Sequence, residues 1–181
     1  MSHAQIAVLA VAAILVFWMV GAYNRLVALR NAIAAAWALV DEVLKKRGDA
    51  VAPLVLALRE PLAGEQNALD ALLAAERQVR SAADALAARP VDAALAAAVV
   101  AGEAAMASSA SRVLALLEQH DDLRQDPAVV AHAAALRDSV AKLNFSRQLF
   151  NEAAEAYNSA VRLFPTRLLA ELYRFAPAGK L

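Results

Sequence analysis

Residues 6–22 read IAVLAVAAILVFWMVGA, and they continue without a helix breaker into residues 23–49, YNRLVALRNAIAAAWALVDEVLKKRGD. The first segment is uninterrupted and apolar. At ~1.5 Å per residue it covers about 25 Å, close to the lower limit for a membrane-spanning helix. Trp18 and Tyr23 lie where interfacial aromatic side chains are expected. The stretch therefore predicts a transmembrane anchor over residues 1–22, in contact with the lipid bilayer through residues 6–22.

A cleaved signal peptide is the alternative interpretation of the same segment. Val20, Gly21 and Ala22 resemble a small-residue cleavage site. However, residues 1–5 contain no Lys or Arg, so the positive region that opens a signal peptide is missing. The helical pattern also continues through Tyr23. We therefore favour a retained anchor, and cleavage stays open.

Basic residues are distributed unequally around the apolar run. Only the α-amino group and His3 precede it, whereas five basic residues follow it: Arg25, Arg30, Lys45, Lys46 and Arg47. Lys and Arg concentrate on the cytoplasmic side of membrane spans. The remainder of the chain is therefore expected in the cytoplasm, behind a single span.

Composition limits the fold and the function. Of the 181 residues, 61% are hydrophobic, and a large share of these is Ala, which favours helix. Lys plus Arg and Asp plus Glu both number 18, so no net charge attracts nucleic acid, which is not expected as a partner. The absence of Cys excludes a disulfide scaffold and a Cys nucleophile. Few Gly and abundant Ala, Leu, Glu and Arg predict an all-α fold.

Pro, Gly and acidic residues divide the chain beyond the anchor into four helical stretches. Asp92 is expected to cap the third stretch, and Asp126 the fourth. Pro53 and Pro165 lie inside periodic segments, so each predicts a kink or a short break. The four stretches cover about residues 24–60, 65–89, 92–119 and 127–173.

Each stretch carries an apolar seam with the alternating spacing of three and four residues that is typical of coiled-coil packing. Short connections between the stretches predict an elongated, antiparallel, up-down-up-down helical bundle over residues 23–175, followed by a short C-terminal tail, residues 176–181. The first seam is Leu26, Leu29, Ile33, Trp37, Val40 and Leu44. The second is Leu69, Leu72, Glu76, Val79, Ala83 and Leu86. The third is Leu95, Val99, Gly102, Met106, Ser109, Val113 and Leu117. The fourth is Leu136, Val140, Leu143, Arg147, Phe150, Ala154, Tyr157, Val161, Phe164 and Leu168.

Two blocks of the sequence carry a resemblance to a known family. Residues 23–49 are similar to the start of LemA family proteins, where a membrane helix is followed by YN-x-LV-x-LRN, then AW, an Asp and a basic pair. Residues 147–165, RQLFNEAAEAYNSAVRLFP, resemble that family's R-x-x-YN-x-x-V-x-x-YN and closing FP. Residues 55–111 match only in helical character, Gly48 stands where an aromatic is usual, and Phe150 replaces a Tyr. The resemblance implies a helical bundle on one anchor in the bacterial inner membrane, with no established enzymatic activity.

The matched blocks supply the candidate structural and interaction residues: Tyr23, Asn24, Arg30, Asn31, Trp37, Asp41, Arg147, Phe150, Asn151, Tyr157, Asn158, Phe164 and Pro165. Among them, Asn151 and Asn158 each follow an aromatic residue and are seven residues apart, so they share one helix face. Asn beside a seam can bridge two helices through its donor and its acceptor. We expect a role in setting helix register, with ligand binding as the alternative.

No constellation in the sequence points to an enzyme. His3, His120 and His132 show no metal-ligand spacing, and no phosphate-binding loop, Ser elbow or paired-carboxylate motif is present. We therefore expect no catalytic, metal or cofactor site. A scaffold or adaptor that binds an unknown protein partner is the favoured function. A signal-relay bundle coupled to the membrane helix is the alternative, and a homo-oligomer stays open.

Two structural expectations follow from the fourth stretch. Arg147 lies in the middle of its seam, and a buried Arg needs a carboxylate unless it reaches solvent. Counting residues along the helices places Asp41 closest to the height of Arg147 along the bundle axis, so Asp41 is the first choice of partner and Glu76 the second. The same counting returns the segment from Pro165 onward to the membrane surface, where its apolar and basic side chains suit the headgroups. The alternative is that these apolar residues complete the bundle core and that the end frays in water.

Overall fold

The computed structural model describes residues 2–181, and within that range the chain is helical with no strand. The long helix α1 covers His3–Leu58. A 3₁₀ turn, η1 (Ala63–Glu65), leads into the helical hairpin of α2 and α3. A short helix, α4, then leads into α5 and α6. The bounds of these later helices are Gln66–Ala88 for α2, Ala93–Glu118 for α3, Asp121–Gln125 for α4, Pro127–Arg162 for α5 and Thr166–Leu172 for α6.

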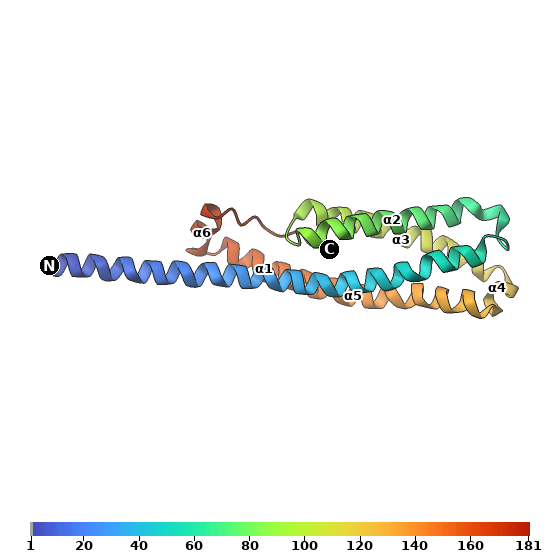
Figure 1. Ribbon diagram of the computed structural model, residues 1–181, viewed down its shortest axis with the longest axis horizontal. Helices are drawn as coiled ribbons and strands as arrows, with labels where there is room; N and C mark the ends of the chain where they lie inside the picture. The colour runs from blue at the N-terminus through green and yellow to red at the C-terminus, as the bar shows by residue number, and fades with distance from the viewer. Residues whose placement is uncertain (1) are drawn as a thin grey trace.

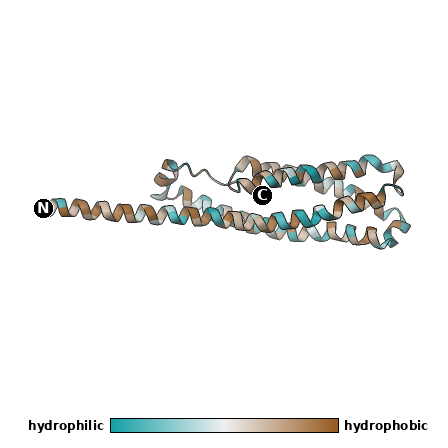
Figure 2. Cartoon of the chain, in the orientation of Figure 1, coloured by the Kyte–Doolittle hydropathy of each residue, from teal (hydrophilic) through white to brown (hydrophobic). Residues whose placement is uncertain are grey.

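The first part of α1 projects beyond the rest of the molecule as a bare apolar rod (Figures 1 and 2). Ser2 caps its start with a capping box that includes Gln5. The apolar side chains of residues 6–18 are exposed, as Phe17 shows with 79% exposure. The segment is long and apolar enough to cross a membrane. By composition α3 meets the same criterion, but α3 is a bundle helix with part of its apolar surface buried.

The helix α1 remains unbroken from the apolar segment into the bundle. A break at Pro53 does not occur, because α1 stays helical to Leu58 with Pro53 inside it. At Pro165, in contrast, the expected break occurs: α5 ends at Arg162, and a cis Phe164–Pro165 peptide bond leads into α6.

The bundle follows the predicted up-down-up-down order (Figure 1). The helix α1 runs toward the distal end, which we define by η1 and α4. The helix α2 returns, α3 runs out again, and α5 returns along α1 to the proximal end, defined by Tyr23 and α6. Direct packing joins α1 to α5, α2 to α3 and α1 to α2. The fold is therefore two helix pairs, α1–α5 and α2–α3, with α3 and α5 facing each other across a groove.

One continuous core connects these helices, and the predicted seams of the first three stretches line it except at Glu76 and Ser109, which are half-buried. Leu26, Trp37, Leu72, Val79 and Met106 are among its buried residues. The helix caps are also as predicted. The Asp92 carboxylate accepts hydrogen bonds from the first turn of α3, and the Asp126 carboxylate does the same for α5. Local sequence signals therefore set where these helices begin.

The fourth seam is wrong at three positions. Val140 is 59% exposed, Phe164 is 81% exposed and Leu168 is 57% exposed. The helix α5 packs mainly on one neighbour, α1, so its buried face is narrow, and Ser139 is buried in place of Val140. Because α5 ends before Phe164, the helical period no longer extends to the last two positions.

Candidate functional site

The space between α3 and α5 forms an open groove of ≈ 670 Å³ with apolar walls. The helix α3 contributes Val100, Met106 and Ala107, and α5 contributes Leu136 and Val140. The groove exists because α3 packs on α2 while α5 packs on α1, so neither helix covers the facing side of the other. Partly exposed apolar side chains in a concave surface are typical of a binding site for another molecule.

The C-terminal tail, residues 176–181, turns back from α6 and lies along α5 at the proximal end of this groove. Asn158 donates to the Ala178 carbonyl at 3.0 Å and accepts from the Ala178 amide at 2.7 Å. Asn151 donates to the Leu181 carbonyl at 2.7 Å and accepts from the Leu181 amide at 2.8 Å. The Tyr157 hydroxyl adds a hydrogen bond to the Ala176 carbonyl at 3.1 Å.

This arrangement depends on a match between two periods. Seven residues of α-helix advance about 10.5 Å. Three residues of extended chain advance about 10 Å. Successive asparagines seven residues apart on α5 can therefore bind backbone groups that are three residues apart in an extended segment. The expected bridge between helices is wrong: the amides of Asn151 and Asn158 bind the backbone of the tail.

The tail also packs closely against α3. A Cβ atom at Gly179 would lie 2.7 Å from the Ala93 Cα and 2.8 Å from the Ala96 Cβ, so only Gly fits there. Lys180 forms an ion pair with Glu155 at 2.6 Å, and the hydrogen bond from Lys180 lowers the pKa of Glu155. The tail is therefore fixed between α3 and α5. The last six residues do not point toward the apolar end of α1, as the expectation of a membrane-lying segment required.

A buried ion pair forms part of the groove wall. Arg47 of α1 and Glu103 of α3 make two side-chain hydrogen bonds, one of them 2.9 Å long. Glu76 of α2 approaches Arg47 at 3.9 Å. Gly48 provides the room, because a Cβ atom there would collide with the Glu76 carboxylate. Burial, with Glu103 acting in the same direction, raises the pKa of Glu76 although Arg47 opposes the shift.

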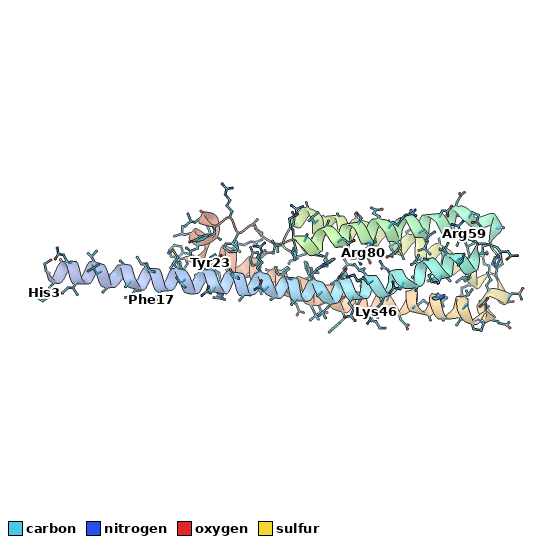
Figure 3. The ribbon with its side chains drawn as sticks, viewed as in Figure 1. His3, Phe17, Tyr23, Lys46, Arg59 and Arg80 are labelled. Carbon is cyan, nitrogen blue, oxygen red and sulfur yellow. The ribbon has the colours of Figure 1, made fainter. Side chains whose placement is uncertain are left out.

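The Asp41 carboxylate binds Arg80 of α2, which is labelled in Figure 3, and Lys45 of its own helix. Burial alone would raise the pKa of Asp41, but the hydrogen bonds from Lys45 and Arg80 hold it below its usual range. The predicted pairing of Arg147 with Asp41 or Glu76 is therefore wrong. Residue counting placed these groups at similar levels but could not say which side of α1 each one faces. Arg147 lies half-buried in the groove wall and pairs with no carboxylate within residues 2–181.

Arg47 is the functional-site residue that sequence reasoning missed. The signal was present, because the first seam continues beyond Leu44 with the same spacing through Arg47, Val51 and Leu54. A charged residue at a seam position predicts a buried partner. The partner, Glu103, directly follows Gly102 of the third seam and is not itself a seam residue. Its contact with α1 depends on tertiary packing, which the sequence pattern does not reveal.

The remaining candidate residues lie at the proximal end. Tyr23 packs against Tyr173 and Phe175, with ring centroids 5.2 Å and 5.9 Å apart (Figure 3). Deeper in the bundle, Trp37 meets Phe150 edge to face at 6.1 Å. These contacts join α1 to the segment after α6 and to α5. Three candidates remain exposed on α1: Asn24, Arg30 and Asn31.

A comparison with curated proteins finds no match to this chain. The model of the LemA family matches residues 36–181. That range contains most of the bundle, the groove between α3 and α5, and the tail that it holds. It also contains the Arg47–Glu103 pair and both asparagines that bind the tail. With so much of its length matched, the chain belongs to the LemA family.

Proposed function

We propose that this protein is a membrane-anchored scaffold or adaptor that binds a protein partner through the groove between α3 and α5. The observation that carries the proposal is the groove itself. It presents apolar side chains from two helices, including Val140 at 59% exposure, and Arg147 lies beside them. An apolar surface with a charged margin is typical of a protein-binding site. The proposed role is non-enzymatic.

The proposed anchor is the apolar first part of α1, residues 6–22. Its side chains point into solvent on every side, which favours lipid as their natural surroundings. Basic residues follow this segment, so we propose the bacterial inner membrane with the bundle in the cytoplasm. The groove would then face cytoplasmic proteins or the cytoplasmic parts of membrane proteins.

The segment around α6 supports the same membrane orientation. It lies beside Tyr23, at the end of the apolar segment, through the contacts of Tyr173 and Phe175. Leu172 is 69% exposed there, and Arg174 follows it. Apolar side chains with neighbouring basic groups suit an anionic membrane surface. We propose that residues 163–175 touch the membrane while the tail holds the bundle.

Signal relay is the second candidate, and the continuity of α1 favours it. A single helix joins the exposed apolar segment to Arg47, which binds Glu103 of α3 in the groove wall. A shift of α1 would therefore move the ion pair and, through it, the groove. Loss of partner binding after two alanines are inserted after Gly21, just before the first bundle contact at Tyr23, would favour relay, because the insertion rotates the bundle relative to the anchor.

Site-specific photo-crosslinking tests the scaffold proposal. A photoreactive amino acid at Val140, inside the groove, is expected to capture a defined partner in cells. The matched control carries it at Asp70, on the outer side of α2 and outside the groove lining. Equal capture at both positions, or none at Val140, would argue against the groove as a docking site.

A further inference from the structure

The asparagines that hold the tail belong to a longer series. Asn144 precedes Asn151 by the same seven residues that separate Asn151 from Asn158. Asn158 binds residue 178 and Asn151 binds residue 181, so an extended segment in the same register along α5 would bring its backbone opposite Asn144. Asn144 lines a surface cavity of ≈ 530 Å³ that also contains Leu181. It therefore presents its amide where a further extended segment would pass.

The groove continues in that direction. Leu181 and Arg147 together line a narrow gap above Val40 and Leu44 of α1. From there the open part of the groove extends along α3 and α5 toward the distal end. The tail is therefore an occupant of the proximal end of a longer channel. The channel beyond it has an amide clamp at Asn144 and apolar walls.

The charges of this channel favour one kind of occupant. Arg47 and Glu103 neutralise each other, and Arg137 pairs with Glu118 at 2.8 Å. Arg147 lines all three cavities along the channel, and within residues 2–181 no carboxylate pairs with it. A half-buried guanidinium without a counter-ion attracts a carboxylate, which it can bind with two hydrogen bonds.

Building on the proposed function, we propose that the open part of this groove, along α3 and α5, binds an extended, acidic segment of a partner protein. The Asn144 amide would bind its backbone, as Asn151 and Asn158 bind the tail. Arg147 would pair with an Asp or Glu carboxylate of the segment. Apolar side chains next to that carboxylate would cover Val140 and Leu143. Binding through the backbone requires an extended segment. The guanidinium of Arg147, which is unpaired within residues 2–181, selects a segment that carries a carboxylate.

The test uses the full chain in detergent micelles and a fluorescent nonapeptide with three Val-Glu-Ala repeats, which brings a carboxylate to every third position. Peptides with Gln or Lys in place of Glu are the charge controls, and fluorescence anisotropy measures binding. The acidic peptide is expected to bind at least tenfold more tightly than the Lys peptide. Arg147→Gln should remove the preference for Glu over Gln, and Asn144→Ala should weaken both peptides.

Two matched variants control for general effects. Asn31→Ala and Arg77→Gln change an exposed Asn and an exposed Arg outside the groove, and both should bind the acidic peptide like the unchanged chain. Circular dichroism should show equal helix content in all variants. Equal binding of the Glu and Lys peptides, or unchanged binding after Asn144→Ala and Arg147→Gln, would overturn the proposal.

Two further outcomes separate this inference from the proposed function. If Val140 captures a defined partner in cells while no peptide binds, the scaffold role stands and the extended acidic occupant is wrong. Self-association that Arg147→Gln abolishes, without peptide binding, would replace the partner segment with a second copy of this chain. Peptide binding that depends on Asn144 and Arg147 supports the inference whatever the crosslinking shows.

Discussion

Arg47 of α1 and Glu103 of α3 face each other through two hydrogen bonds and are only 7% and 8% exposed. They are 56 residues apart in the sequence. The ion pair joins the α1–α5 pair to the α2–α3 pair where α3 and α5 make no extensive contact. It therefore links the two helix pairs across the groove wall.

Breaking this ion pair should be strongly destabilising. Arg47→Met leaves the Glu103 carboxylate buried without its partner, which costs about 3–5 kcal/mol. The double variant Arg47→Met/Glu103→Leu should recover most of that loss, because the Glu103 carboxylate no longer stays buried without its partner. Urea unfolding measures both. Lys46→Met, which breaks only the exposed pair with Glu42, should change stability little, because solvent screens that pair. A loss of similar size for Lys46→Met and Arg47→Met would contradict this assignment.

Glu76 should make stability depend on pH. Its pKa is raised in the folded state, so its contribution to stability is complete below the unfolded-state pKa and is lost as pH rises through the folded-state pKa. Glu76→Gln should therefore raise the melting temperature at pH 7, and the gain should disappear near pH 4. Glu42→Gln is the control, since Glu42 is exposed and its pKa is lowered. A destabilised Gln variant at pH 7 would show that attraction to Arg47 outweighs burial.

Gly102 should be intolerant of side chains. A Cβ atom there would lie 3.3 Å from the Val79 Cγ2 and 3.4 Å from the Val79 Cα, so the contact is already tight before the two further methyl groups of a Val are added. Gly102→Val is expected to cost about 1–3 kcal/mol through overpacking. Ala101→Val tests the helix-propensity effect alone, since Ala101 is exposed on the same helix. Denaturant unfolding should show a clearly larger loss at residue 102, and equal losses would remove packing as the cause.

Loss of an asparagine clamp should release the tail. Asn158→Ala removes both hydrogen bonds to Ala178 and should speed amide exchange of residues 176–181 by about tenfold or more. Hydrogen–deuterium exchange measures this locally. The exposed Asn24→Ala provides the control and should leave the tail protected. If the Ala178 amide stays protected from exchange in Asn158→Ala, the packing of Gly179 against α3 is enough to hold the tail without the Asn158 side chain.

The segment around α6 should bind anionic membranes. In a fragment of residues 23–181, Leu172→Ser should weaken sedimentation with anionic vesicles, and Arg174→Gln should remove about 1 kcal/mol of binding. Added salt should weaken binding in the same direction. Arg112→Gln, at the distal end beside Glu65, should have no effect. Binding that is insensitive to salt and to both α6 substitutions would contradict this proposal.

Much of this fold was readable from local sequence. The apolar run and the seam from Leu26 to Leu44 predicted a continuous first helix, and the acidic caps Asp92 and Asp126 predicted where two later helices begin. The short connections between the helices predicted that consecutive helices pack antiparallel to each other. The two sequence blocks at residues 23–49 and 147–165 also predicted the family. These features depend on residues close together in the sequence, which is why the sequence alone reveals them.

Other features depended on how the helices are rotated about their axes. Residue counting gives the level of a side chain along the bundle, but it does not give the side on which it lies. For that reason Arg147 was assigned to Asp41, although Asp41 faces Arg80 and Arg147 faces the groove. The same uncertainty placed Val140 in the core.

By itself, then, the sequence determined the helices, their ends, their order and the family. Only the tertiary structure decided that Arg47 meets Glu103 and that α3 and α5 stand apart. It also decided that Asn151 and Asn158 hold the tail. The physical reason is that helix period and capping are short-range, whereas these contacts join residues 20 to 56 positions apart. Their partners are selected only when the two helix pairs pack and leave a groove wide enough for an extended chain.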